Sequence, residues 1–140
     1  MSFIATITIL ALIIMGWFHF YWAFDGKVGL DKALPTKDGI KLLNPSKALT
    51  FFVGIVLIVF AYIAYGLQFY DFTVNTNKSF YLYSGIFLSI TFTIRAIGEF
   101  NAVGFFKKIK GTEFAIYDTK YFSPLCIILG IVFAMLAYKV

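Results

Sequence analysis

Four ionisable side chains stand inside or at the ends of long apolar runs: His19, Arg95, Glu99 and Asp118. Arg95 and Glu99 are four residues apart, so on a helix they share one face and can form an ion pair. An ionisable residue within a membrane span usually faces the bundle interior or a water-filled cavity. An acid, a base and a guanidinium group in one place could move a proton and hold an anionic or carbonyl group. We therefore treat these four side chains as candidate catalytic residues.

Aromatic and amide side chains close to these charges form a candidate ligand-binding set. The set comprises Trp17, Tyr21, Trp22, Asn101 and Tyr121. Its rings would wall the apolar part of an amphipathic ligand, such as a lipid, an isoprenoid or a quinone. A purely structural interpretation also stands, in which Trp and Tyr form an interfacial belt, Arg95 reaches lipid phosphates, Asp118 caps a helix and His19 bonds a carbonyl. The sequence leaves both interpretations open.

The composition indicates that these residues are carried by a membrane protein. The chain has 140 residues, of which 61% are hydrophobic and 14% are charged, too apolar a balance for a soluble domain of this length. With one histidine and one cysteine, Cys126, the chain offers no intrachain disulfide, and no metal site is expected. No cofactor is required by the sequence, although a haem held by His19 or a bound quinone stays open.

Apolar runs long enough to cross a bilayer as helices define the organisation. They cover residues 3–24, 47–69, 80–100 and 122–138, with polar loops at 25–46 and 101–121 and a short connection at 70–78. The first run lacks a preceding basic segment and a small-residue cleavage site, so we expect a retained helix and no cleaved signal peptide. The predicted fold is an all-α, four-helix transmembrane bundle that forms a single domain over residues 1–140.

The basic residues predict how the bundle is oriented. Of the 12 lysines and arginines, all except Lys78 and Lys139 fall on the side of the membrane that holds the two long loops. The positive-inside rule then places those loops in the cytoplasm and both termini outside, in a bacterial cytoplasmic membrane. The same distribution accounts for the net charge of +5 without a nucleic-acid partner, so the lipid bilayer is the expected partner.

The two halves of the chain share short motifs at an offset of 76 positions. Gly-Ile-Val at 54–56 recurs at 130–132, and Ala-Tyr at 61–62 recurs at 137–138. The offset predicts two parallel helix–loop–helix repeats and makes His19 equivalent to Arg95. Chance matching between apolar runs is the alternative explanation.

Three segments together carry a resemblance to a known family. They read Trp17-x-His19-x-Tyr21-Trp22-Ala23, then Arg95-Ala96-Ile97-Gly98-Glu99-Phe100, then Asp118-x-x-Tyr121-x-Ser123-Pro124-Leu125. With these motifs the chain resembles, over nearly its whole length, the bacterial membrane family filed as domain of unknown function 3995. The resemblance implies a small multi-span bacterial membrane protein, and it implies no reaction.

Three functional hypotheses follow. In the first, a polar pocket near the cytoplasmic leaflet binds or transforms an amphipathic ligand. In the second, the protein is a non-catalytic accessory subunit of a larger membrane complex, or a homo-oligomer, assembled through small-residue faces at Gly54, Gly66 and Gly130. In the third it is a small transporter or channel, which the repeat favours and the apolar second and fourth runs argue against.

Overall fold

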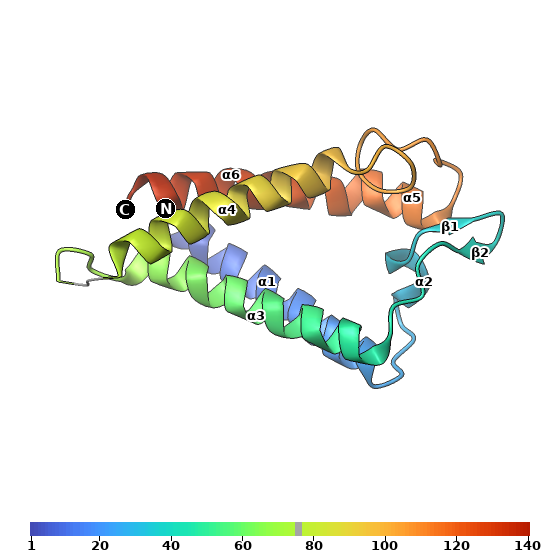
Figure 1. Cartoon of the computed structure of the whole chain (residues 1–140), viewed down its shortest axis with the longest axis horizontal. Coiled ribbons are helices and arrows are strands. Elements are labelled where there is room, and N and C mark those ends of the chain that lie inside the picture. The colour runs from blue at the N-terminus through green and yellow to red at the C-terminus, as the bar shows by residue number, and fades with distance from the viewer. Residues whose placement is uncertain (75–76) are drawn as a thin grey trace.

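The computed structural model describes residues 1–74 and 77–140, and helices dominate that part of the chain. The long helices are α1 (Ser2–Ala23), α3 (Lys47–Phe69), α4 (Lys78–Ile97) and α6 (Ser123–Tyr138) (Figure 1). A short helix, α5 (Glu113–Tyr117), runs into α6 through a π-helical turn at Asp118–Phe122. In the described residues, four helical segments are long and apolar enough to cross a membrane, and the last of them is the whole of Glu113–Tyr138. The predicted all-α bundle with four apolar helices is confirmed.

The helix ends differ from the predicted spans where local backbone chemistry intervenes. Helix α4 ends at Ile97, three residues before the end of the predicted span, because Gly98 takes a φ of 86°, which stops a right-handed helix. The fourth segment begins at Glu113 rather than 122, because the Thr112 hydroxyl accepts the Ala115 N–H at 3.1 Å and caps a new helix there. The predicted connection at 70–78 includes residues 75–76, which lie outside the described residues.

The long helices associate as two hairpins, α1 with α3 and α4 with α6. In the first hairpin two glycines bring the backbones together: a Cβ atom on Gly54 would lie 3.1 Å from the carbonyl oxygen of Gly16. In the second, the Ser89 hydroxyl donates a hydrogen bond of 2.8 Å to the Gly130 carbonyl. Small residues and hydroxyls thus give both hairpins the close backbone approach that favours helix pairing in lipid.

The glycines that were expected to face a partner protein are used inside the chain. Gly54, Gly66 and Gly130 are all buried. A Cβ atom on Gly66 would lie 2.1 Å from the Tyr81 ring, and one on Gly130 would lie 2.7 Å from the Thr93 hydroxyl. These small-residue faces therefore serve the packing of the bundle itself, and they lend no support to assembly with another subunit.

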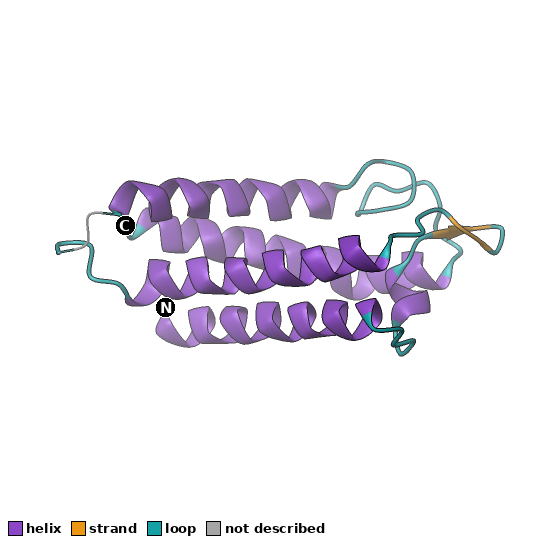
Figure 2. Ribbon diagram, turned by 60° about the horizontal axis from the view of Figure 1, so that its bottom comes forward, coloured by secondary structure: helices purple, strands orange, loops and turns teal. Residues whose placement is uncertain are grey.

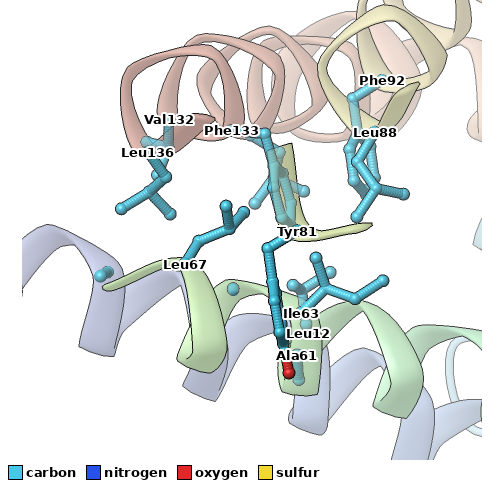
Figure 3. Close-up of a cluster of buried hydrophobic side chains, with 13 residues drawn as sticks. Leu12, Ala61, Ile63, Leu67, Tyr81, Leu88, Phe92, Val132, Phe133 and Leu136 are labelled. Atoms are coloured by element: carbon cyan, nitrogen blue, oxygen red, sulfur yellow. The ribbon is translucent and has the colours of Figure 1, made fainter. Parts of the chain in front are cut away.

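The hydrophobic core lies in the half of the bundle that holds the termini. Figure 3 shows side chains of both hairpins meeting there. They include Leu12 of α1, Leu67 of α3, Tyr81 and Leu88 of α4, and Phe133 and Leu136 of α6. Both chain ends lie at this end of the molecule, and the two hairpins diverge toward the opposite end (Figure 1). The hairpins are therefore held together mainly by apolar contact in one half of the membrane thickness.

The long connections form a cap at the opposite end. The first contains helix α2 (Leu30–Ala33) and a two-stranded antiparallel sheet of β1 (Thr36–Lys37) and β2 (Ile40–Lys41), which projects beyond the helices (Figure 2). Helix α2 contacts α5, and the Lys32 ammonium lies 5.1 Å from the centre of the Tyr117 ring. Hydrogen bonding with the Tyr117 side chain raises the pKa of Lys32, so this link between the two hairpins stays cationic.

Candidate functional site

The described residues bury one carboxylate completely, and it belongs to Asp118, whose exposed fraction is 0%. Asp118 opens the π-helical turn between α5 and α6. Such turns add a residue to the helical register, and they occur frequently at functional sites because they redirect side chains. The turn also lets the Ser123 hydroxyl, five residues further on, donate a hydrogen bond of 3.2 Å to the same carboxylate.

Two cations and a backbone amide complete the surroundings of this carboxylate. The Arg95 Nη2 atom donates to Asp118 Oδ1 at 3.0 Å, and the Lys107 ammonium donates to Oδ2 at 3.1 Å. The Gly104 N–H donates to Oδ2 at 2.7 Å. A buried carboxylate with two cationic and two neutral donors is well compensated, so Asp118 holds α4, the following loop and α6 together at one point.

Lys107 is buried nearly as deeply as its partner, with a side-chain exposure of 1%. Its ammonium also donates to the Gly104 carbonyl at 2.8 Å and to the Thr119 hydroxyl at 2.6 Å. All three donor positions of the ammonium are therefore occupied. The first lysine of the basic run at 107–110 thus lies inside the protein.

Two glycines shape the loop that delivers Lys107. A Cβ atom on Gly98 would lie 1.8 Å from the Val103 carbonyl oxygen, and one on Gly104 would lie 2.4 Å from the Gly98 Cα atom. Both glycines have positive φ angles, 86° and 89°. The chain thus crosses itself at Gly98 and Gly104, and the Phe105 N–H then donates to the Ala96 carbonyl at 2.8 Å. The loop satisfies a free carbonyl at the end of α4 while it turns Lys107 inward.

Arg95 differs from Lys107 because part of its hydrogen-bonding capacity is unused. The arginine lies in the last turn of α4, and 35% of its side chain is exposed. Its Nη1 atom is buried and has no hydrogen-bond partner among the residues that the structure describes. Two cations face one carboxylate here, so the cluster of Arg95, Lys107 and Asp118 carries one surplus positive charge.

Glu99 does not pair with Arg95 as the helical spacing predicted. Because α4 ends at Ile97, Glu99 lies beyond the helix and no longer shares a face with Arg95. One of its carboxylate oxygens accepts the backbone N–H groups of Ala102 and Val103, the second at 3.0 Å. Within the described residues the ion pair of Arg95 is to Asp118 instead. Glu99 therefore organises the loop that carries Lys107.

The candidate residues of α1 lie on the other hairpin. His19 is half-buried, its Nδ1 atom is 2.7 Å from the Met15 carbonyl oxygen, and its ring lies 5.1 Å from the ring of Trp22. The Trp22 indole N–H donates to the Val28 carbonyl at 2.9 Å, and Tyr21 lies against the Gly26 backbone. Trp17 is 65% exposed on the outer face. In the described part of the chain these side chains therefore bond and pack within their own hairpin.

Asn101 lies in the loop that carries Lys107, and Tyr121 lies in the π-helical turn that Asp118 opens. The Asn101 carbonyl accepts the N–H groups of Lys108 and Ile109 at 2.9 Å, which is a backbone role. Tyr121 is exposed, and its ring lies 5.6 Å from that of Tyr117. Of the nine candidate residues, the structure brings Arg95 and Asp118 into direct contact.

Two grooves formed by the described residues lie away from the charge cluster. Both are open and lie on the α1–α3 hairpin, one lined by Ile13, Trp17, Phe20, Ile55, Ile58 and Val59. The other is lined by Ala23, Phe24, Asp25, Lys47, Ala48 and Phe51. Neither groove includes Arg95 or Asp118, so the polar pocket that the sequence predicted around those residues has no counterpart in these grooves.

Sequence reasoning missed Lys107, Gly104 and Ser123 as members of the cluster. A signal for the loop was present, because two glycines six positions apart immediately after an apolar run are typical of a chain reversal. The sequence does not indicate that Lys107 rather than Lys108 is buried. The two lysines are adjacent, and only the folded loop determines which of their side chains points inward. Ser123 is five residues from Asp118, and the π-helical turn brings its hydroxyl to the carboxylate.

The fold and composition define a multi-pass membrane protein built as a four-helix bundle. The chain belongs to the family described as "Protein of unknown function (DUF3995)", whose sequence profile matches residues 12–133. That match spans both hairpins and the whole charge cluster, and it confirms the resemblance stated from the motifs. Comparison with curated proteins and with solved structures found no match.

Proposed function

We propose that this membrane protein binds an amphipathic ligand through an anionic or carbonyl group, with Arg95 as the binding residue. The observation that carries the proposal is the buried Nη1 atom of Arg95, which has no hydrogen-bond partner in the part of the chain that the structure describes. A buried donor without an acceptor costs about 1–3 kcal/mol. A ligand oxygen at this atom would remove that cost.

The charge balance of the cluster supports an anionic ligand. Asp118 neutralises one of the two cations that contact it, and the second charge is left over. Lys107 has its three donor positions filled, whereas Arg95 is partly exposed at the end of α4. The surplus charge is therefore accessible at Arg95, where the planar guanidinium suits a phosphate or carboxylate.

The geometry favours binding over proton transfer. Glu99 is engaged by the backbone of its own loop, and His19 lies on the other hairpin with its Nδ1 atom against a carbonyl. A general acid or base must reach the reacting group within hydrogen-bond distance. We therefore propose that Arg95 binds the ligand and that Asp118 positions Arg95. His19 and Glu99 have structural roles.

We further propose that the charge cluster faces the cytoplasm of a bacterial cell. The two long connections lie at one end of the bundle and the termini at the other (Figure 1). The connections carry most of the basic residues. Under the positive-inside rule this end is cytoplasmic, and Arg95 would meet ligands from the inner leaflet.

Native mass spectrometry of protein gently extracted from its own membrane tests this proposal. We compare the wild type with Arg95→Gln, with Arg95→Lys, and with Lys108→Gln as a control that removes an exposed charge in the same loop. A retained amphiphile should fall at least tenfold in occupancy in Arg95→Gln, fall less in Arg95→Lys, and stay unchanged in Lys108→Gln. Equal retention in folded Arg95→Gln and wild type would refute a binding role for Arg95.

A further inference from the structure

We propose a second binding site, on the outer face of the α1–α3 hairpin, for a phospholipid with an ethanolamine headgroup. The site consists of the two grooves on this hairpin and the ion pair of Asp25 and Lys47 at its loop end. It is separate from the Arg95 cluster, which belongs to the α4–α6 hairpin. The proposal therefore does not depend on the function proposed above.

The two grooves follow one another along the hairpin. The inner groove has a volume of about 470 Å³ and an almost wholly apolar lining, and the outer one has about 490 Å³ and contains the ion pair. They are separate grooves that meet where Phe20 of the inner one lies against Phe51 of the outer one, with ring centres 4.9 Å apart. An apolar groove near the middle of the helices is thus followed by a charged groove at the loop end.

The two grooves together match one leaflet of a bilayer in length. At ~1.5 Å per residue, the α1 segment from Ile13 to Ala23, where the helix ends, spans about 15 Å. The hydrocarbon core of a bilayer is about 30 Å thick, so this segment covers roughly half of it, and the ion pair of Asp25 lies just beyond the helix end. An acyl chain would lie beside Ile13, Ile58 and Val59, and the headgroup would lie at the ion pair.

The charged end has the polarity of a zwitterion. The Lys47 ammonium lies 2.7 Å from Asp25 Oδ2, and both side chains are about 70% exposed, at 68% and 71%. Lys47 is the first residue of α3, so the positive end of that helix dipole adds to its charge. Asp25 follows the end of α1, where the dipole is negative. A lipid phosphate is attracted to the α3 side and a lipid ammonium to the α1 side.

Asp25 carries a negative charge at a position where the end of α1 makes a negative charge unfavourable. Residues just after a helix end usually carry cations or glycine, and Asp25 puts a carboxylate there with a φ of 68°. An ion pair this exposed contributes only about 0–1 kcal/mol to stability, so pairing with Lys47 does not explain it. Together with Lys47 it leaves the site neutral, which suits a zwitterionic lipid better than an anionic one.

The choice of ethanolamine over choline follows from hydrogen bonding. An ethanolamine ammonium has three N–H donors for a carboxylate, whereas a quaternary choline has none. Asp25 would therefore distinguish two lipids that carry the same phosphate and the same acyl chains. Lys47 would contact the phosphate, which both lipids share.

The test uses the full-length protein in nanodiscs that contain equal amounts of ethanolamine and choline phospholipids with identical acyl chains. Native mass spectrometry then counts the lipids retained after release. We expect the wild type to retain the ethanolamine lipid at least fivefold over the choline lipid. Asp25→Asn should abolish that preference, Lys47→Gln should lower retention of both lipids, and Val59→Trp should displace both by filling the groove.

Controls separate this site from the rest of the surface. Asp38→Asn removes another exposed carboxylate of the same loop and should keep the wild-type preference. Lys108→Gln, which removes an exposed charge from the other long connection, should also keep it. Equal retention of the two lipids by the wild type, or an unchanged preference in folded Asp25→Asn, would overturn the proposal. Stronger retention of an added anionic lipid than of either zwitterion would overturn it as well.

Discussion

Replacing Asp118 by Asn tests whether this buried carboxylate fastens the α4–α6 hairpin. Oδ1 accepts Arg95 and Ser123, and Oδ2 accepts Gly104 and Lys107. An asparagine keeps one acceptor and turns two donors toward groups that themselves donate. The least costly arrangement puts the amide nitrogen beside Ser123, whose hydroxyl can accept, and leaves Arg95 without its partner.

The magnitude follows from burial. Removing one partner of a buried ion pair costs about 3–5 kcal/mol, because the remaining charge is left uncompensated. Lys107 is 1% exposed and cannot turn to water, whereas Arg95 is 35% exposed and can recover some hydration. We therefore expect Asp118→Asn to lower the free energy of unfolding by about 3 kcal/mol, at the lower end of that range. Asp25→Asn, which breaks an exposed pair, should cost under about 1 kcal/mol.

Equilibrium unfolding in mixed detergent micelles, followed by far-UV circular dichroism, measures both variants. The single thiol, Cys126, lies half-buried in α6, and its alkylation rate reports locally on that helix. Arg95→Met combined with Asp118→Asn should be less destabilised than the sum of the single changes by about 1–3 kcal/mol, since the double variant removes the cation that Asp118→Asn leaves without its partner. Strict additivity, or equal losses in Asp118→Asn and Asp25→Asn, would refute the reasoning.

Two further predictions concern the loop and the orientation. Gly98→Ala should cost about 1–3 kcal/mol in the same unfolding assay, because its φ is 86° and its Cβ would meet the Val103 carbonyl, whereas Gly111→Ala has open space and should change little. Equal effects of the two substitutions would contradict the crossing at Gly98. In a Cys126→Ser background, a membrane-impermeant maleimide should label Thr73→Cys in intact bacterial cells and Thr36→Cys only after permeabilisation. The opposite labelling pattern would reverse the proposed orientation.

The helices were predictable because their signal is local. Four apolar runs of membrane-spanning length leave few alternatives to helices, since backbone groups in lipid must bond within their own segment. At the beginning of α3, Ser46 caps the helix by accepting the Leu49 N–H at 3.1 Å. Pro124 lies in the first turn of α6, directly after the π-helical turn.

The site was only partly predictable from the sequence, because its contacts depend on the path of the loop that follows α4 and folds back against the end of that helix. The sequence singles out Arg95 and Asp118 as unusual, and the structure shows that they meet at 3.0 Å. The expected partner, Glu99, depended on the helix continuing past Gly98, whose positive φ ends it. The burial of Lys107 follows from the crossing of Gly98 and Gly104, which brings together residues that no helical periodicity relates.

The offset of 76 positions allows corresponding residues of the two hairpins to be compared. In both, a glycine of the second helix, Gly54 or Gly130, packs against the backbone of the first helix. His19 and Arg95, the residues that the offset equates, each lie near the end of the first helix of their hairpin. Only the second hairpin, among the described residues, adds a loop that carries a buried lysine to a buried carboxylate. Close packing at a glycine is common to both hairpins, and the charge cluster is an addition of the second hairpin that fastens its loop to α4 and α6.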